Sequence, residues 1–213
     1  MRKYDKIETI YARDIEGTKK LIEGQFRDPV VGYLAPLEWV WTEKVDGTNI
    51  RVYWDGHTVT FGGRTDNAAI PAPLVTKLNE LFGGETNAQI FEQMFGEKEV
   101  ILFGEGYGRK IQKVGSSYIP DGVGFILFDV LIGENYQERE WVEQTAQAFD
   151  IPVIPIVNTG SLFEAVNFIK THPQSLIGNC PMEGIVCRPR QELRDRRGNR
   201  VIVKIKWEDF KDL

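Results

Sequence analysis

The sequence of 213 residues is poor in the side chains on which disulfide frameworks and many metal centres depend. It contains two cysteines, Cys180 and Cys187, and two histidines, His57 and His172. Two cysteines are too few for a disulfide framework, and no CxxC pair is present for zinc or redox chemistry. Two histidines exclude a multi-histidine metal centre and disfavour a histidine-based catalytic triad. We therefore expect two reduced thiols and a chemistry that does not depend on histidine.

Long apolar stretches are absent as well. Residues 1–13 are charged throughout and lack the apolar core of a secretory signal. The longest apolar run, residues 123–132, is interrupted by Asp129 and has the length of a strand. We expect a soluble, intracellular and cytoplasmic protein that is a monomer and has no membrane partner.

Charge of one sign does not dominate the chain. Its 26 Lys and Arg stand against 31 Asp and Glu, a net charge of −5, which disfavours nucleic-acid binding through a uniformly basic surface. A local basic face is sufficient for such binding, and residues 186–213 hold nine basic and five acidic residues, a net charge of +4. We expect residues 194–200 to be either a solvated hairpin loop or a contact surface for phosphates.

The common motifs for phosphate binding and acyl transfer are also missing. The sequence has no G-x-x-x-x-G-K-[ST] loop, no G-x-G-x-x-G fingerprint and no G-x-S-x-G elbow. The glycines around Glu105 have the wrong spacing for a dinucleotide fingerprint. Nucleotide chemistry, if present, must use a different arrangement.

What the sequence does contain is a mixture of short strands and helices. Ile50, Val52 and Trp54 alternate with polar or half-exposed positions, and the Asp-Gly turn at residues 55–56 follows, which predicts a β-hairpin. Apolar spacing predicts helices near residues 74–81, 90–95 and 138–149, and a capping box predicts one from residue 161 to 170. Residues 17–25 are predicted to be a short helix or a turn. No long linker is visible, so we expect one α+β domain over residues 1–213, with antiparallel sheets flanked by helices.

The most distinctive segment is Glu43-Lys44-Val45-Asp46-Gly47-Thr48-Asn49, with a lysine at a predicted strand end. Taken alone, it is more often a hairpin with a solvated lysine. A lysine that acts as a nucleophile must be deprotonated, and a free lysine has a pKa of about 10.4, so nearby cations or desolvation are required.

Several further segments carry side chains that suit nucleotide chemistry. Each has an ordinary structural explanation when taken alone, such as a core phenylalanine or a solvated lysine. They are Arg64 after the hairpin, Glu105 between two glycines, Phe128 in an apolar strand, Glu183 before a strand, and Lys204 and Lys206 on one face of the last strand.

In this order and spacing, the segments resemble the motifs of the covalent nucleotidyltransferases, the superfamily of polynucleotide ligases and mRNA capping enzymes. Residues 44–49 match the nucleophile motif K-x-D-G-x-N. Arg64, Glu105, Phe128-Asp129, Glu183-Gly184 and Lys204-Ile205-Lys206 match the motifs that follow it. The resemblance covers residues 43–206, about three-quarters of the chain.

Within that superfamily the chain most resembles the RNA ligase 2 type, because Glu43 precedes the lysine and the motif ends at Asn49. The chain ends seven residues after Lys206, so we expect neither an OB-fold domain nor the C-terminal helical domain of RNA ligase 2. The expected fold is a stand-alone nucleotidyltransferase (ATP-grasp-like) domain. Asp46 departs from RNA ligase 2, which has histidine there, and agrees with DNA ligases.

The resemblance implies an ATP-dependent RNA ligase that joins 3′-OH and 5′-phosphate ends through a lysyl-AMP intermediate on Lys44. It implies ATP and Mg²⁺ (or Mn²⁺) as cofactors and RNA or RNA-containing duplex ends, or DNA, as partners. The implied roles are phosphate binding for Arg64, Lys204 and Lys206, metal binding for Glu183 and Glu105 (ribose binding is the alternative for Glu105), adenine stacking for Phe128, and nucleotide binding for Glu43 and Asn49. The alternatives are a DNA or RNA–DNA nick ligase and a non-catalytic nucleotide- or RNA-binding module.

Overall fold

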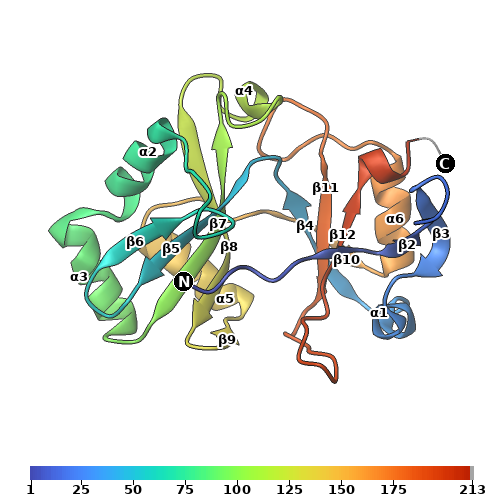
Figure 1. The fold of residues 1–213 in the computed structure, drawn as a ribbon, viewed down its shortest axis with the longest axis horizontal. Helices are drawn as coiled ribbons and strands as arrows, with labels where there is room; N and C mark the ends of the chain where they lie inside the picture. Colours follow the sequence, from blue (N-terminus) through green and yellow to red (C-terminus); the bar gives the residue numbers. More distant parts are fainter. Residues whose placement is uncertain (212–213) are drawn as a thin grey trace. The chain divides into compact units, whose positions relative to one another are not determined.

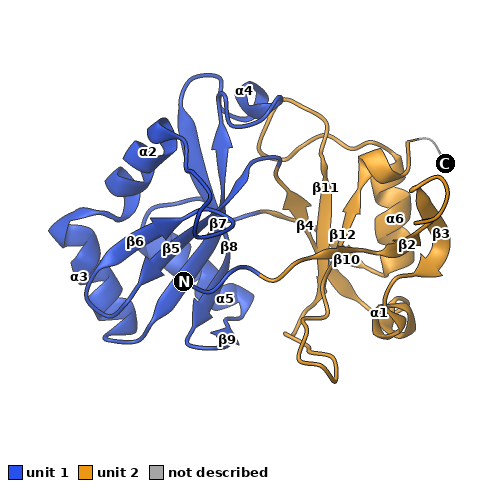
Figure 2. Ribbon diagram, in the orientation of Figure 1, with its two compact units in different colours: residues 1–4, 46–154 blue, residues 5–45, 155–213 orange. Residues whose placement is uncertain are grey.

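The computed structural model describes residues 1–211, which form two compact units that alternate along the chain (Figures 1 and 2). Unit 1 comprises Met1–Tyr4 and Asp46–Ile154, and unit 2 comprises Asp5–Val45 and Pro155–Leu213. The chain passes between the units three times without a long linker, which is why composition alone does not reveal them. The single catalytic domain over residues 1–213 stays a prediction.

Unit 1 is built on a five-stranded antiparallel sheet in the order β6-β5-β7-β8-β9 (Figure 1). The strands are β5 (Thr48–Trp54), β6 (Val59–Gly62), β7 (Val100–Gly108), β8 (Val123–Ile132) and β9 (Asn135–Tyr136). The helices are α2 (Ala72–Phe82), α3 (Gly84–Phe95), the short α4 (Gly115–Tyr118) between β7 and β8, and α5 (Arg139–Ala148).

The two faces of this sheet are buried by different partners. Helices α2, α3 and α5 supply the buried Leu78, Phe91 and Val142 to a core on one face. On the other face Phe103 belongs to a smaller apolar cluster, which the ring of Tyr4 joins at 4.9 Å from the Phe103 ring. The N-terminal residues therefore cover part of the sheet face that the helices leave open.

Unit 2 contains a second five-stranded sheet in the order β1-β12-β11-β4-β10. Its strands are β1 (Glu8–Thr9), β4 (Trp39–Lys44), β10 (Ile156–Gly160), β11 (Gly184–Pro189) and β12 (Val203–Lys206), and only the edge pair of β1 with β12 is parallel. The remaining elements are β2 (Tyr11–Arg13), β3 (Leu21–Phe26), α1 (Pro29–Leu34), α6 (Leu162–Lys170) and the 3₁₀ turn η1 (Trp207–Asp209). Odd-numbered residues of these strands, such as Trp41, Ile185 and Ile205, pack in one hydrophobic core together with residues of α6.

The structure confirms the predicted α+β class with antiparallel sheets flanked by helices, and it confirms the hairpin of β5 and β6. The capping box is also present, because Ser161 Oγ accepts from the Glu164 amide while the Glu164 carboxylate accepts from the Ser161 amide. The prediction for residues 17–25 is wrong from residue 21 onward. That stretch is strand β3, which pairs with β2, and such a distant pairing is invisible in local periodicity. Within residues 1–211, no helix is long and apolar enough to cross a membrane.

Candidate active site

Strand register in unit 2 places three predicted lysines on one sheet face. Gly184 of the central strand β11 lies opposite Lys44 of β4 on one side and opposite Lys206 of β12 on the other. Lys204 lies two residues before Lys206 and therefore shares its face. A Cβ atom on Gly184 would lie 2.3 Å from the carbonyl oxygen of Ile205, so only glycine fits between the two lysine-bearing strands.

Glu183 bridges two of these lysines. Its Oε2 lies 2.7 Å from Lys44 Nζ and its Oε1 lies 2.8 Å from Lys206 Nζ. The backbone is fixed at the same point, because the Trp207 amide donates to the Glu183 carbonyl at 3.1 Å. The carboxylate therefore holds the predicted nucleophile and a second cation in a defined geometry at the ends of their strands.

The two C-terminal lysines have opposite electrostatic surroundings. Burial, together with the nearby Lys44 and Lys206 ammonium groups, lowers the pKa of Lys204, although Glu8 and Asp209 oppose the shift. Burial also acts to lower the pKa of Lys206, but the hydrogen bond and charge of Glu183 outweigh it, so this pKa is raised. Lys44 and Lys206 bind the Glu183 carboxylate, and Lys204 lies near both of these ammonium groups. The three lysines form a positive cluster that suits a polyphosphate.

Glu43 does not join this cluster, and its role in nucleotide binding stays a prediction. Strand alternation puts its side chain on the core face with Trp41, opposite to Lys44, and Glu43 is 1% exposed. One carboxylate oxygen accepts from Ser175 Oγ at 2.5 Å and the other from the Leu176 amide at 2.8 Å. Burial raises the pKa of Glu43 even though these two hydrogen bonds act to lower it. Both oxygens are therefore used in supporting the neighbouring turn rather than in facing a ligand beside Lys44.

In unit 1, the Gly-Glu-Gly sequence of β7 has a packing explanation. A Cβ on Gly104 would lie 2.2 Å from the Phe125 ring, and a Cβ on Gly106 would lie 2.3 Å from a Leu74 methyl group. Both glycines thus face the helix-covered core, and Glu105 lies on the opposite face, across from Asn49 of β5. Asn49 Oδ1 is buried and accepts no hydrogen bond from the described residues, so it is available to a ligand donor.

The two phenylalanines of β8 belong to different faces, although a register shift at Phe128 interrupts the regular alternation of the strand. Phe125 is 1% exposed and its ring packs edge-on against Phe82 at 5.3 Å in the helix-covered core. Phe128 is half-buried on the other face and lies edge-on to Tyr4 at 5.0 Å. A partly exposed aromatic ring is therefore present on the same sheet face as Glu105.

Arg64 is exposed just beyond the end of β6, and sequence reasoning missed the residue that supports its turn. Arg51 is fully buried, donates from Nε to the Gly63 carbonyl at 2.7 Å, and pairs with Asp66 at 2.9 Å. It also donates to the carbonyl of Met1 at 2.9 Å. The alternation in β5 indicated a solvent-facing Arg51, but the N-terminal residues cover it. The one available signal was the glycine at position 62, directly opposite, which leaves room for a guanidinium.

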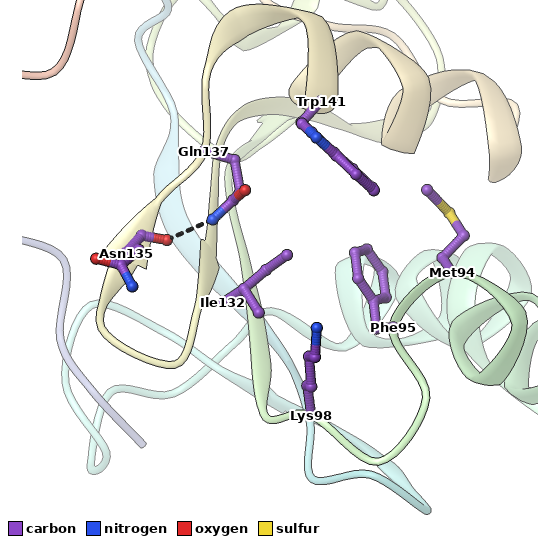
Figure 3. A pocket seen from close by; sticks show the side chains of 7 residues that line it. All are labelled: Met94, Phe95, Lys98, Ile132, Asn135, Gln137 and Trp141. Atoms are coloured by element: carbon purple, nitrogen blue, oxygen red, sulfur yellow. Dashed lines mark hydrogen bonds between the residues drawn. The ribbon is translucent and has the colours of Figure 1, made fainter.

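A pocket of about 290 Å³ lies elsewhere in unit 1 (Figure 3). Its walls are Met94, Phe95, Lys98, Ile132, Asn135, Gln137 and Trp141. The Gln137 side chain donates to the Asn135 carbonyl at 2.8 Å. None of the predicted site residues lines this pocket, and it contains no carboxylate, so the candidate site is not built on it.

Comparison with known proteins gives one family and one group of similar structures. The model of the RNA ligase family matches residues 37–206. The solved structure of Naegleria gruberi RNA ligase with PPi has a TM-score of 0.67 and 20% identity, and the match covers 100% of this chain and 57% of that one. Two variants of that ligase with ATP and Mn give TM-scores of 0.68 and 0.69, identities of 19% and 18%, and coverage of 100% of this chain and of 59% and 57% of theirs. The chain thus spans about three-fifths of the length of these proteins. No curated protein matches the sequence.

Proposed function

The chain belongs to the RNA ligase family, and on that basis we propose that it is an ATP-dependent RNA ligase that joins 3′-OH and 5′-phosphate ends through a lysyl-AMP intermediate. The observation that carries the proposal is the register of β4, β11 and β12, which places Lys44, Lys204 and Lys206 on one sheet face, with Glu183 bound to Lys44 and Lys206. A nucleophilic amine, two phosphate-binding cations and one acid are the groups that nucleotidyl transfer requires.

In the first step Lys44 Nζ attacks the α-phosphorus of ATP. A nitrogen–phosphorus bond forms, the bond to the bridging oxygen of the β-phosphate breaks, pyrophosphate leaves and the amine loses a proton. Lys204 and Lys206 hold the phosphates and neutralise their charge as it develops. Glu183 Oε2 lies 2.7 Å from Lys44 Nζ, so the amine must leave this contact before its lone pair can attack.

AMP then passes to the 5′-phosphate of an RNA end, with release of Lys44. A 3′-hydroxyl next attacks that phosphate, AMP leaves and a phosphodiester bond forms. Neither step needs another covalent residue of this chain, so its contribution is to bind and orient the ends. Asn49 Oδ1, which lacks a donor in the described chain, accepts from a nucleotide hydroxyl or amine, Phe128 stacks on the base, and Arg64 binds phosphate.

A divalent metal fits the acid of this site, and it supplies charge neutralisation on the phosphates when bound. Mg²⁺ is usually held by one or two carboxylates together with substrate phosphates and water. Each oxygen of Glu183 carries one lysine, and both lysines gain phosphate partners when the nucleotide binds. Glu183 of unit 2 would then hold the metal. For Glu105 of unit 1, we propose binding of the ribose or of a metal.

The test is intact-protein and peptide mass spectrometry after incubation with ATP and Mg²⁺. The proposal expects one adenylyl group on Lys44 and release of pyrophosphate, whereas a non-catalytic binding module gains no mass. Incubation with nicked duplexes of RNA, DNA and mixed strands then separates an RNA ligase from a DNA or RNA–DNA nick ligase. Adenylation of a different lysine, or none, would refute the assignment of Lys44.

A further inference from the structure

Three basic side chains follow the end of β7 within five residues: Arg109, Lys110 and Lys113, all exposed and with no acid between them. Arg109 pairs with Asp121 at 2.9 Å, but the two side chains are 53% and 91% exposed, and a pair so open to water is weak. Neither Lys110 nor Lys113 has an ion-pair partner among residues 1–211. In a chain of net charge −5, this loop is a concentrated positive patch.

The loop that carries these cations is held in one conformation. A Cβ on Gly115 would lie 1.9 Å from the Gly108 carbonyl oxygen, so the start of α4 packs directly against the end of β7. The Arg109 amide donates to the Gly122 carbonyl at 2.9 Å and closes the base of the loop. Lys110 has a φ of 64°, a conformation that costs a non-glycine residue free energy and is often retained for function. Contacts within unit 1 therefore brace the backbone that carries the positive patch.

The same loop also holds the turn that follows the predicted nucleophile. Gln112 Nε2 donates to the Gly47 carbonyl at 3.0 Å, and the Asp46 amide donates to the Tyr118 hydroxyl at 3.3 Å. Tyr118 is 8% exposed, and its ring meets Tyr107 edge-on. One side of the loop thus supports the K-x-D-G turn while its basic residues face water.

The position of the patch favours a chain of phosphates over a single nucleotide. Arg109 lies four residues beyond Glu105 in β7, about 13 Å along an extended strand at ~3.3 Å per residue. Glu105 is the proposed nucleotide residue, so the patch lies further along β7 and the loop after it than that residue. Repeated positive charges along a rigid loop match the repeated charges of a nucleic-acid backbone.

We infer that residues 109–113 are a contact surface for the phosphate backbone of the RNA strand that the enzyme joins. The inference rests on the proposed function. The RNA strand takes no part in the proposed adenylation step, which involves only ATP and the nucleotide-binding groups. The loop therefore has a partner that those groups do not contact in that step. The inference thus predicts that RNA binding and adenylation respond separately to changes in the loop.

The test compares two double variants of equal charge change in unit 1. Lys110→Ala with Lys113→Ala removes the patch. Lys77→Ala with Lys98→Ala removes a half-buried lysine of α2 that pairs with Glu80 and an exposed lysine from the turn before β7. Binding of a nicked RNA duplex is measured by fluorescence anisotropy without ATP over a range of salt. Two lost phosphate contacts should reduce the slope of log K against log salt by about 1.4–1.8. The control pair should leave the slope unchanged.

Lysyl-adenylate formation with ATP alone should be unchanged in the patch variant, because Gln112 and Tyr118 remain. The inference would be overturned if the patch variant kept the wild-type salt slope. It would also be overturned if the patch variant and the control pair lost the same affinity for RNA. A parallel loss of adenylation would also overturn it, since the lysines would then act through the K-x-D-G turn. Because binding is measured without ATP, a wild-type protein that binds RNA through the patch but forms no adenylate would instead refute the proposed function.

Discussion

The two units present their candidate residues in different ways. In unit 2 the charged groups contact one another, since Glu183 binds both Lys44 and Lys206. In unit 1 the candidates are set by the pleat of one sheet, which places Glu105 across from Asn49, whose Oδ1 accepts no hydrogen bond from the described residues. Unit 2 therefore holds a pre-assembled reactive cluster, whereas unit 1 offers surfaces that need a ligand to complete them. We expect changes in unit 2 to act on the rate of the chemical step and changes in unit 1 to act on binding.

The largest expected effect is that of Lys44→Ala, which should abolish lysyl-adenylate formation. Lys44→Arg should fail as well, because a guanidinium stays protonated and cannot attack. The side chain is 28% exposed and pairs with Glu183, so the melting temperature should change little. Mass spectrometry after incubation with ATP and Mg²⁺ measures the outcome, with Lys98→Ala as an exposed-lysine control. Retention of a covalent adenylate in Lys44→Ala would show that another residue is the nucleophile.

Glu183→Gln should have the next largest effect, because it keeps the shape of the side chain and removes the charge that both lysines bind. Glu183 is the proposed metal ligand, and the loss of a charge-assisted contact worth about 1.5–3 kcal/mol in the transition state should slow adenylation on the order of 10- to 100-fold. Single-turnover rates at saturating ATP give the chemical step directly. Glu208→Gln is the matched control, since Glu208 is exposed and pairs with Lys211. Equal adenylation rates for the two variants would show that the charge of Glu183 does not contribute to the chemical step.

The paired phenylalanines of β8 test the assignment of unit 1 to binding. Phe128→Ala should raise the KM for ATP about tenfold, because stacking on a base is worth about 1–3 kcal/mol. Phe125→Ala should instead lower the free energy of unfolding by about 3–5 kcal/mol, since Phe125 is fully buried against Phe82. Steady-state adenylation and urea unfolding of both variants separate the two roles. If Phe125→Ala raised the KM more than Phe128→Ala while folded, the face assignment of β8 would be wrong.

A smaller effect is expected from the basic loop of unit 2, for which the sequence left two interpretations open. Arg200 is buried in a 2.6 Å pair with Glu192, and Arg194 donates to the Gly198 carbonyl, so both have structural roles. Asp212, which contributes to the net charge of residues 186–213, lies outside the described residues. Arg196 and Arg197 remain exposed, and replacing both with alanine should weaken end-sealing a few-fold without changing adenylation.

The measurement for this pair is sealing of a pre-adenylated RNA end, with the salt dependence of binding beside it. If both arginines contact phosphate, the slope of log K against log salt falls by about 1.4–1.8. Unchanged sealing and an unchanged slope would identify the loop as a solvated hairpin. Comparison with the patch of residues 109–113 then shows which unit contributes more contacts to RNA.

Local pattern was sufficient for much of the fold and for the order of the site residues. The period of two in β5 and the spacing of leucines in α2 were visible because each element buries one face. Strand β3 was missed because its identity depends on pairing with β2. The hydrogen-bond partners of Glu43, Ser175 and Leu176, could not be predicted because they are more than 130 residues away in the sequence. Burial by a distant segment likewise hid the role of Arg51. Local sequence periodicity indicates on which face of a strand a side chain lies. It does not indicate which distant residues contact that side chain.

The smallest expected effect concerns the pH dependence of stability in unit 2. The pKa of Lys206 is raised above its ordinary value of 10.5 by Glu183 despite opposing burial. Its contribution is therefore fully present below about pH 10.5 and is lost as the pH rises through the higher folded-state value. Glu183→Gln should lower the free energy of unfolding at pH 8 by on the order of 1 kcal/mol, because the ion pairs are partly exposed. The difference from wild type should narrow as the pH rises above 10.5. Urea unfolding at a series of pH values measures it, and a difference that stayed constant up to pH 11 would show that Lys206 does not owe its raised pKa to Glu183.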